Sequence, residues 1–487
     1  MGMADAVGIK AFGAYIPRMR LKRAAAATAH GWAFPALQGL AKGARAFTDW
    51  DEDSITMGVE AARDAFASRD RSQVDALFLA STTLPFIDRS NAGIASLALD
   101  LPQTLRTLDI TGSLRAGTSA MLTALCTSKP RDTLVVAAEA RKTKPASSQE
   151  LRYGDAAAAV IVGSKDVIAV FRGAASLNAD FVDHYRAEGQ KHDYVWEERW
   201  ARDEGYLKLV PATVRRLFAD TGLAATEVDR LIVPVALPGV AEGVSRAIGV
   251  RAEALAPQLL DECGDAGAAY PILLLARELE RARPGQKIVV VGVGNGCDAL
   301  LFEATGHIGS CNPRRGVDRA IKRGVEIGDY LKFLALRDEI ELDWGMRSEF
   351  TNKIALTTEY RHSREMLAFI GGRCTRTGTV QFPKSRVSVN PEVHAVDTQV
   401  DAPLADAPAR VVSFTADWLS YYPNPPFYFG LVQFENGARV SMEFTDVDRS
   451  LLRIGAPVSM VFRLKELDRR RAYRHYFWKA TPVASDQ

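Results

Sequence analysis

One turn in the first quarter of the sequence has the features of a catalytic turn. The stretch Asp109–Met121 reads DITGSLRAGTSAM, a glycine turn that leads into a helix of small residues. A helix N-terminus offers N–H groups and the positive end of the helix dipole, a setting in which enzymes place nucleophiles. The residue at the tip is Leu114, which has no nucleophilic group. The chain is therefore either an enzyme that works without a nucleophile at this position or a protein that is no catalyst.

Three titratable residues, Asp183, His184 and Tyr185, form a second candidate for acid–base chemistry. They stand in VDHYR, an expected loop ahead of the charged helical segment WEERWARDEG. Loops often carry catalytic side chains, so we predict that this triplet supplies a proton donor or acceptor. The alternative is a solvated surface, since i,i+4 ion pairs along such a helix contribute only roughly 0.2–0.5 kcal/mol each.

Two cysteines and one glycine-rich stretch resemble catalytic or nucleotide-binding motifs but do not match them. Cys263 and Cys297 lie beside glycine turns, and we interpret them as small, buried, inert thiols. The stretch GVGNGCD lacks the lysine of a phosphate-binding loop and the third glycine of a dinucleotide fingerprint. Neither feature therefore predicts a nucleophile or a nucleotide site.

An internal repeat organises the first 310 residues. QVDALFLASTT from Gln73 has the counterpart EVDRLIVPVAL from Glu227, 154 positions later, and DTLVVAAEA has the counterpart QKIVVVGVG at the same offset. DITGSLRAGTSAMLTAL pairs with DECGDAGAAYPILLLA at an offset of 152. Each half alternates helical periodicity with short β-branched runs, which predicts a duplicated α/β layer.

Duplicated halves related by a pseudo-twofold axis bring equivalent positions together. The turn at Gly112 and Ser113 and the turn at Gly264 and Asp265 are equivalent in this repeat. We expect their helix N-termini to converge on one pocket, where backbone N–H groups would stabilise an anionic intermediate.

These segments resemble the thiolase superfamily, and within it the 3-hydroxy-3-methylglutaryl-CoA synthase branch. GIKAFGAYIPRMRL, RAGTSA, VDHYR and GNGCDALLF carry the resemblance, which covers about residues 8–310. It implies a duplicated, five-layer thiolase-like α/β fold, coenzyme A as substrate or acyl carrier, and a homodimer. We expect the apolar strand DTLVVAAEA to pair across the dimer axis.

In that family a cysteine takes an acyl group from CoA, supported by a glutamate, a histidine and an asparagine. The resemblance places Leu114 at the cysteine, Leu84 near the glutamate, and Pro234 or Ala236 at the histidine. It places Asp265 at the asparagine, and it matches Asp183 to a family aspartate. Three catalytic positions are therefore apolar, and no covalent cysteine intermediate is expected.

The last third of the chain differs from the repeat. We predict four regions, namely thiolase-like halves at 1–165 and 166–310, a helical linker arm at 311–370, and an all-β OB-fold domain with a degenerate zinc ribbon at 371–487. The stretch GGRCTRTGTVQFPKSRVSVNPEV resembles the zinc ribbon that precedes an OB-fold in acyl-CoA-associated domains. A ribbon needs four thiolates, but the resemblance places only Cys374 at such a position, with Thr377, Ser388 and Val393 at the others. We therefore expect no metal, and we interpret His394 as a surface residue.

Composition narrows the partners and the compartment. The chain has 61 Lys and Arg against 59 Asp and Glu, a net charge of +2, which predicts neither nucleic acid nor an anionic membrane as partner. Its 5 cysteines form no even framework, and its longest apolar runs are too short to cross a bilayer. No secretory signal pattern opens the sequence. We expect a cytoplasmic protein.

The predicted function is that of a CoA-dependent acyltransferase or C–C bond-cleaving enzyme acting on a β-keto acid or β-ketoacyl-CoA, an aromatic one included. The CoA thiolate attacks the keto group directly, and the resulting enolate needs an oxyanion hole and an acid. Alternatives are a retro-aldolase for a β-hydroxyacyl-CoA, a non-catalytic acyl-CoA-binding scaffold or partner of another thiolase-like enzyme, and a condensing enzyme that uses another cysteine. The predicted catalytic residues are Ser113, Asp183, His184, Tyr185, Asp265 and Asn295, and the predicted substrate-binding residues are Leu84, Leu114, Arg115 and Tyr270.

Overall fold

The computed structural model describes residues 6–127, 131–311, 313–348 and 354–483. The chain forms two compact units. The first comprises Met1–Thr48, Asp53–Ser96 and Leu101–Ile340, and the second comprises Asp49–Glu52, Leu97–Asp100 and Glu341–Gln487. Each unit is described by itself.

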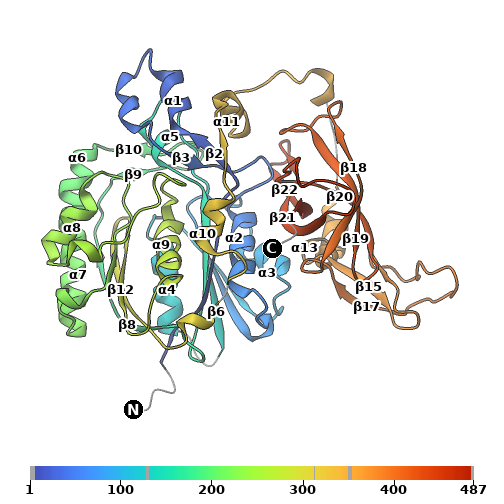
Figure 1. Ribbon diagram of the computed structural model, residues 1–487, viewed down its shortest axis with the longest axis horizontal. Coiled ribbons are helices and arrows are strands. Elements are labelled where there is room, and N and C mark those ends of the chain that lie inside the picture. Colours follow the sequence, from blue (N-terminus) through green and yellow to red (C-terminus); the bar gives the residue numbers. More distant parts are fainter. Residues whose placement is uncertain (1–5, 128–130, 312, 349–353, 484–487) are drawn as a thin grey trace. The chain divides into compact units, whose positions relative to one another are not determined.

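The first unit is built on strands in the order β11-β12-β13-β8-β1-β7-β6-β4-β5. Figure 1 labels β12, β8 and β6 of this sheet. Only two residue pairs, Gly8 with Val170 and Ile9 with Ala169, join β1 to β8, so the arrangement is two half-sheets that share one edge. The strands are β1 (Gly8–Tyr15), β4 (Val74–Ala80), β5 (Arg106–Ile110), β6 (Asp132–Glu139), β7 (Ala156–Gly163), β8 (Ala169–Asn178), β11 (Arg230–Ile232), β12 (Lys287–Val293) and β13 (Gly296–Ala304).

The strand order confirms the predicted duplication. Counting outward from the junction of β1 and β8, the sequence-repeat partners β7 and β13, β6 and β12, and β4 and β11 occupy equivalent places. β6 and β7 are buried along almost their whole length, as expected for strands covered on both faces.

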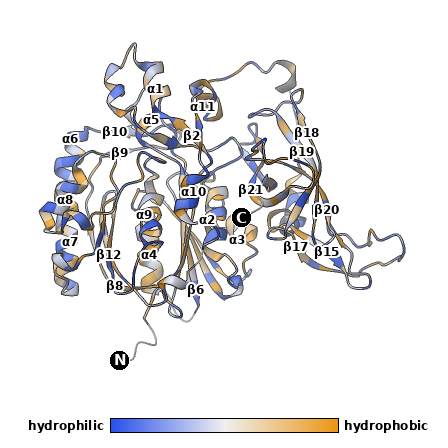
Figure 2. Ribbon diagram, viewed as in Figure 1, coloured by the Kyte–Doolittle hydropathy of each residue, from blue (hydrophilic) through white to orange (hydrophobic). Residues whose placement is uncertain are grey.

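Helices fill the spaces between and outside the half-sheets. The main helices of this unit are α2 (Ser54–Phe66), α3 (Asn91–Ala98), α4 (Ala116–Thr127), α7 (Leu207–Thr221), α8 (Val240–Ile248) and α9 (Tyr270–Leu279). α4 and α9 each contact strands of both half-sheets, α2 packs on β1, β6 and β7, and α7 packs on β8 and β13. The result is the predicted five-layer α/β fold. Hydrophilic and hydrophobic residues mix along α7, as an outer helix requires (Figure 2).

The small residues of the catalytic-like helix have a packing reason. A Cβ at Gly117 in α4 would lie 2.2 Å from the carbonyl oxygen of Ala268, just before α9. A Cβ at Gly292 in β12 would lie 2.1 Å from Oγ1 of Thr118. The two repeat-related helices therefore meet near their N-terminal ends, as the pseudo-twofold predicts.

One expectation about strand pairing is wrong. β6, in the segment predicted to pair across a dimer axis, lies between β4 and β7, so both of its edges are already paired. The edge strands of this sheet are β5 and β11, and Leu108 of β5 is 45% exposed.

The predicted linker arm at 311–370 is divided between the two units. Its first part, to Ile340, belongs to the first unit, where β14 pairs with β2 and Phe333 packs in a small core with Leu21 and Phe47. The remaining elements of this unit are β2 (Met19–Lys22), α1 (Arg23–His30), β3 (Ala44–Ala46), α5 (Ser148–Arg152), β9 (His184–Tyr185), β10 (Tyr194–Val195), α6 (Glu198–Trp200), α10 (Gly316–Lys322), β14 (Val325–Ile327) and α11 (Tyr330–Leu336), with short 3₁₀ turns between them.

The second unit is mainly β structure. Five antiparallel strands in the order β20-β19-β18-β21-β22 form the main sheet, and β16-β15-β17 form a smaller one. Their bounds, with two short helices, are α12 (Leu356–Arg361), α13 (Ser363–Leu367), β15 (Ile370–Cys374), β16 (Val380–Gln381), β17 (Gln399–Pro403), β18 (Ala409–Asp417), β19 (Phe427–Phe434), β20 (Arg439–Glu443), β21 (Pro457–Asp468) and β22 (Tyr473–Pro482). In the described ranges, every helix of the chain is too short or too polar to span a bilayer.

Candidate active site

The Leu114 turn lies immediately before α4. Gly112 has a φ of +98°, a left-handed conformation that favours glycine, and Ser113 and Leu114 are half-buried. The side-chain oxygen of Ser113 accepts a hydrogen bond from the Arg115 N–H at 3.3 Å. In the part of the chain that the structure describes, the Leu114 N–H donates to no acceptor. One backbone donor of the predicted oxyanion hole is therefore available.

The hairpin between β12 and β13 lies directly on this turn. A Cβ at Gly294 would lie 2.9 Å from the backbone nitrogen of Leu114, so only glycine fits there. Asn295 has a φ of +49°, which is unusual for a residue with a side chain. Its Nδ2 donates to the carbonyl oxygen of Phe181 at 3.3 Å. Asn295 therefore connects the Leu114 turn to the segment that leads into Asp183.

Asp183 and His184 form a hydrogen-bonded pair. Oδ1 of Asp183 lies 2.8 Å from Nδ1 of His184 and also accepts the His184 backbone N–H. Burial by itself would raise the pKa of Asp183, but the His184 hydrogen bond and charge hold it below the ordinary value. Burial likewise opposes the charged form of His184, and the Asp183 bond overcomes it and raises the pKa of the imidazole. The pair thus favours a protonated, oriented imidazole.

Arg141 and Asp265 form an ion pair, and the charge of Arg141 acts on His184. The buried guanidinium of Arg141 donates to the carbonyl oxygen of Asp265 at 3.0 Å and lies 3.5 Å from the ring centre of Tyr153. Although burial opposes its charge, Tyr153 and the nearby carboxylates, Asp265 first, raise the pKa of Arg141. The backbone N–H of Asp265 donates to Arg152 O at 2.8 Å. This corrects the expectation that the Asp265 turn offers that N–H to an oxyanion.

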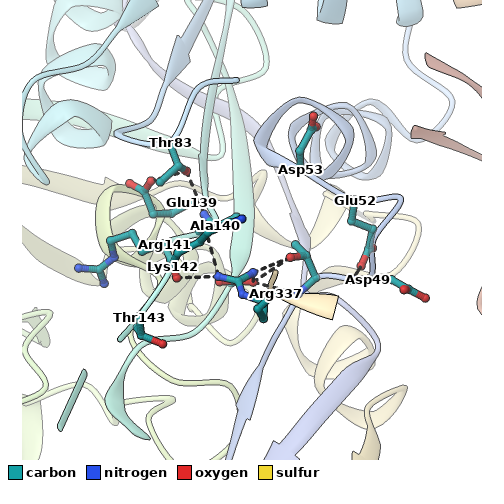
Figure 3. Close-up of polar contacts among 12 residues, drawn as sticks. Asp49, Glu52, Asp53, Thr83, Glu139, Ala140, Arg141, Lys142, Thr143 and Arg337 are labelled. Atoms are coloured by element: carbon teal, nitrogen blue, oxygen red, sulfur yellow. Dashed lines mark hydrogen bonds and ion pairs between the residues drawn. The ribbon is translucent and has the colours of Figure 1, made fainter. Parts of the chain in front are cut away.

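Glu139 is a buried carboxylate that the sequence analysis missed. It ends β6 and lies close to Thr83 (Figure 3), whose Oγ1 donates a hydrogen bond to it at 2.6 Å. Glu139 also accepts hydrogen bonds from Oγ1 of Thr82 at 3.0 Å and from the Ala268 N–H at 3.3 Å. Burial raises its pKa against the pull of Arg141 and these donors. The sequence signal that could have identified Glu139 is its place as a charged residue at the end of an apolar run, in VVAAEAR.

A buried arginine from beyond the repeat fixes the segment that carries Glu139 and Arg141. Arg337, which follows α11, donates to the carbonyl oxygen of Arg141 at 2.6 Å and to Oδ2 of Asp155 at 2.5 Å (Figure 3). The backbone after β6 is therefore held by the part of the predicted arm that packs into the first unit.

A second ion pair connects the His184 hairpin to the Glu139 loop. Arg186 binds Asp193 at 2.7 Å and also donates to the carbonyl oxygen of Thr82. Oδ2 of Asp193 and Nε of Arg141 are buried and have no hydrogen-bond partner among the described residues. Orphaned buried polar atoms cost free energy, and the Asp193 carboxylate lies within electrostatic range of Arg141.

The other predicted residues fall in different places. The Arg115 guanidinium donates hydrogen bonds to the carbonyl oxygen of Leu177 at 3.2 Å and to Oδ1 of Asp298 at 3.5 Å. Tyr270 is fully buried, and its hydroxyl accepts the Leu259 N–H. Both side chains are thus committed to protein contacts rather than open to a substrate. Leu84 is half-buried in the loop after β4, and Tyr185 is 52% exposed.

The two cysteines nearest the glycine turns are poor nucleophiles. Cys263 and Cys297 are 1% and 0% exposed. Burial raises the pKa of each thiol to about 12. This supports the interpretation of both as inert, since the thiolate is the reactive form.

The described residues contain no group of three or more His, Cys, Asp or Glu placed to hold a metal ion. Cys374, the remaining residue of the predicted ribbon, contacts Oγ1 of Thr398 at 3.2 Å. The absence of zinc stays a prediction.

Comparison with known proteins connects these observations to a family. The chain is 29% identical over 346 residues to the hydroxymethylglutaryl-CoA synthase of Aeropyrum pernix, covering 69% of this chain and 95% of that protein. It is 27% identical over 314 residues to the enzyme of the same name from Methanopyrus kandleri, covering 63% and 89%. The first unit is similar to HMG-CoA synthases. This confirms the resemblance inferred from the sequence motifs.

Solved structures give the same fold. A crystal structure of HMG-CoA synthase complexed with CoA aligns with a TM-score of 0.60 at 17% identity, covering 72% of this chain and 95% of that one. The 3-oxoacyl-(acyl carrier protein) synthase III of Pseudomonas aeruginosa aligns with a TM-score of 0.55 at 20% identity, covering 62% and 98%. Residues 402–463 match the family described as "ChsH2, C-terminal OB-fold domain". The thiolase-like fold and the OB-fold domain are both confirmed.

Proposed function

We propose that this HMG-CoA synthase-like protein makes or breaks a carbon–carbon bond next to a thioester or keto group, through an enolate and without an acylated residue. The observation that carries the proposal is the Asp183–His184 pair beside a nucleophile-free turn. An imidazole oriented by a carboxylate is a general acid–base group, and its raised pKa keeps it protonated to higher pH.

Coenzyme A as a substrate rests on the relatives. The HMG-CoA synthases that match this chain are named for a CoA thioester, and one structural neighbour holds CoA. These relatives support a CoA-dependent acyl transfer or condensation. The β-keto substrate and the cysteine-free course are our own extension.

In the cleaving direction the atoms balance without a covalent enzyme intermediate. The CoA thiol loses its proton to solvent, and the resulting thiolate adds to the keto carbon of a β-ketoacyl-CoA; the bond between that carbon and the α-carbon then breaks. The electron pair passes to the α-carbon as an enolate, and protonated His184 donates a proton there and regains one from solvent. Two acyl-CoA molecules result from one β-ketoacyl-CoA and one CoA, with the Leu114 N–H as a donor to the developing oxyanion.

The absence of a competent thiol supports the non-covalent course. Leu114 occupies the position that the resemblance assigns to the cysteine, and Cys263 and Cys297 stay protonated because they are buried. A two-step covalent route needs a thiolate. A direct attack by CoA uses the thiolate of CoA itself, so the protein needs to supply only the acid and the oxyanion donors.

A panel of β-keto acids and β-ketoacyl-CoAs, incubated with and without CoA and read by mass spectrometry, tests the proposal. We expect new acyl-CoA products that require added CoA and that a His184→Gln variant fails to form. Cleavage of β-hydroxyacyl-CoAs without added CoA would indicate the retro-aldolase instead. Acyl-CoA binding with no turnover of any substrate would contradict the proposal and favour the scaffold function.

A further inference from the structure

A π-helical turn places one tyrosine beside the cluster just described. Residues Ala201–Tyr206 form this turn directly before α7, and Tyr206 is its last residue. π-turns insert an extra residue into a helix and occur frequently at functional sites. The shift in helical phase changes which residue faces inward at this end of α7.

The turn is anchored to the segment that reaches Asn295. The ring of Phe181 stacks on Trp200 with a centroid distance of 5.6 Å and an interplanar angle of 14°. A Cβ at Gly205 would lie 2.7 Å from the same Phe181 ring. The carbonyl oxygen of Phe181 accepts a hydrogen bond from the Asn295 side chain. Gly205, which precedes Tyr206, therefore packs against a residue that is bonded to the hairpin beside Leu114.

Tyr206 is half-buried, packs against the apolar core beside α7 and lies within electrostatic range of the site's charged groups. Burial first, and then the nearby Asp183 and Asp265 carboxylates, raise its pKa well above the ordinary value of tyrosine, while Arg141 opposes them. A tyrosinate is therefore disfavoured here, and the group stays a neutral O–H donor.

Among the described residues, the Tyr206 phenol O–H makes no hydrogen bond to a protein acceptor. The site also lacks one of its expected oxyanion donors, because the Asp265 N–H is committed to Arg152. An oxyanion hole combines backbone N–H groups with side-chain donors, tyrosine among them. The site therefore lacks the expected backbone donor of Asp265, and Tyr206 offers a phenol O–H that no protein acceptor uses.

We propose that Tyr206 is a catalytic residue whose phenol O–H donates a hydrogen bond to the substrate oxygen that becomes the enolate oxygen. The inference rests on the proposed function and assigns the second oxyanion donor, with the Leu114 N–H as the first. Tyr206 keeps its proton throughout, so the proton that the α-carbon loses or gains passes through His184.

Deuterium exchange at the α-carbon of acetyl-CoA tests this assignment. The protein is incubated with acetyl-CoA in D₂O, and mass spectrometry measures deuterium in the acetyl group, a readout that requires enolate formation but no complete reaction. Tyr206→Phe removes only the hydroxyl. Tyr194→Phe is the matched control, because Tyr194 lies on the β9–β10 hairpin and is 56% exposed.

We expect Tyr206→Phe to slow exchange by about 10²–10³-fold, the typical cost of losing one oxyanion donor. Acetyl-CoA affinity should change little, and Tyr194→Phe should behave like the wild type. Replacement of Tyr206 by fluorotyrosines of graded acidity should change the exchange rate with phenol acidity, which a merely structural role would not do.

The outcomes separate the two proposals. Exchange by the wild type that is equally fast in Tyr206→Phe would overturn the role of Tyr206 and leave the enolate chemistry intact. Acetyl-CoA binding without any exchange by the wild type would overturn the proposed function, and the assignment of Tyr206 with it.

Discussion

Oδ1 of Asp183 lies 2.8 Å from Nδ1 of His184, and Nε2 of the same ring has no partner among the described residues. The aspartate therefore fixes one side of the imidazole and leaves the other nitrogen to act on a substrate. This is the arrangement in which a carboxylate orients a general acid–base histidine. The sequence places the two residues next to each other, and the β9–β10 hairpin gives them this geometry.

Replacing His184 should remove most of the activity. Loss of a positioned general acid typically costs about 10²–10⁴-fold in rate, so we expect that loss for His184→Gln with little change in acyl-CoA affinity. His192→Gln is the matched control, since His192 lies in the same hairpin segment and binds Glu339 at 3.0 Å instead. Equal rates for the two variants would refute an acid role for His184.

The pH dependence of the rate should report the raised pKa of His184. In hydrogen exchange at the α-carbon of acetyl-CoA the neutral imidazole takes the proton, so the exchange rate should rise as pH rises through a value above 6.5, the ordinary histidine pKa. Asp183→Asn removes the carboxylate that raises this pKa and should move the rise to lower pH. A profile that Asp183→Asn leaves unchanged would contradict the pairing.

The same pair should contribute to stability in two pH windows. The folded-state pKa of His184 is raised, so its contribution is complete below the unfolded value and is lost as pH rises through the folded value. The folded-state pKa of Asp183 is lowered, so its contribution is present above 3.8 and is lost as pH falls through the folded value. Urea unfolding of the wild type and His184→Gln across pH measures both losses.

Much of the fold followed from the sequence because the repeat is a long-range signal. The shared offset of the Gln73 and Glu227 segments predicted that β4 and β11 occupy equivalent places, and the strand order confirms it. The repeat did not predict which strand lies at the edge of the sheet. Apolar content marks a buried strand, but it does not distinguish burial inside one sheet, as for β6, from burial at a dimer axis.

Candidate site residues were predicted in two ways, from neighbours in one loop and from the repeat with its family resemblance. Asp183 and His184 were identified from the loop that contains them. Glu139 was missed because one of its donors, the Ala268 N–H, comes from the other half of the repeat. Tyr206 was missed because a helical period of 3.6 residues does not reveal the π-turn that positions it.

The C-terminal unit should fold without zinc. A ribbon site needs four ligands, and the chain has Cys374 with Thr377, Ser388 and Val393 at the expected positions. We expect elemental analysis of the purified protein to find zinc far below one ion per chain, and chelators to leave its thermal unfolding unchanged. One tightly held zinc per chain would overturn this expectation.

The predicted homodimer should form through β5 instead of β6. β5 is an edge strand with an unpaired side, and such edges readily accept another strand. Leu108→Asp would place a charge at the new interface and should shift the protein toward monomer in sedimentation experiments at micromolar concentration. Val325→Asp is the control, because Val325 is similarly exposed on a different sheet. A monomeric wild type would contradict the prediction.

The central claim is that catalysis proceeds without an acylated residue, and intact-protein mass spectrometry of acid-quenched turnover mixtures tests it most directly. The account predicts that substrate is consumed while the protein mass stays unchanged, and that alanine at Cys263 and Cys297 costs stability of about 1 kcal/mol each but little rate. Accumulation of a protein species heavier by one acyl group, with the modification mapped to a Cys263 or Cys297 peptide, would contradict the account.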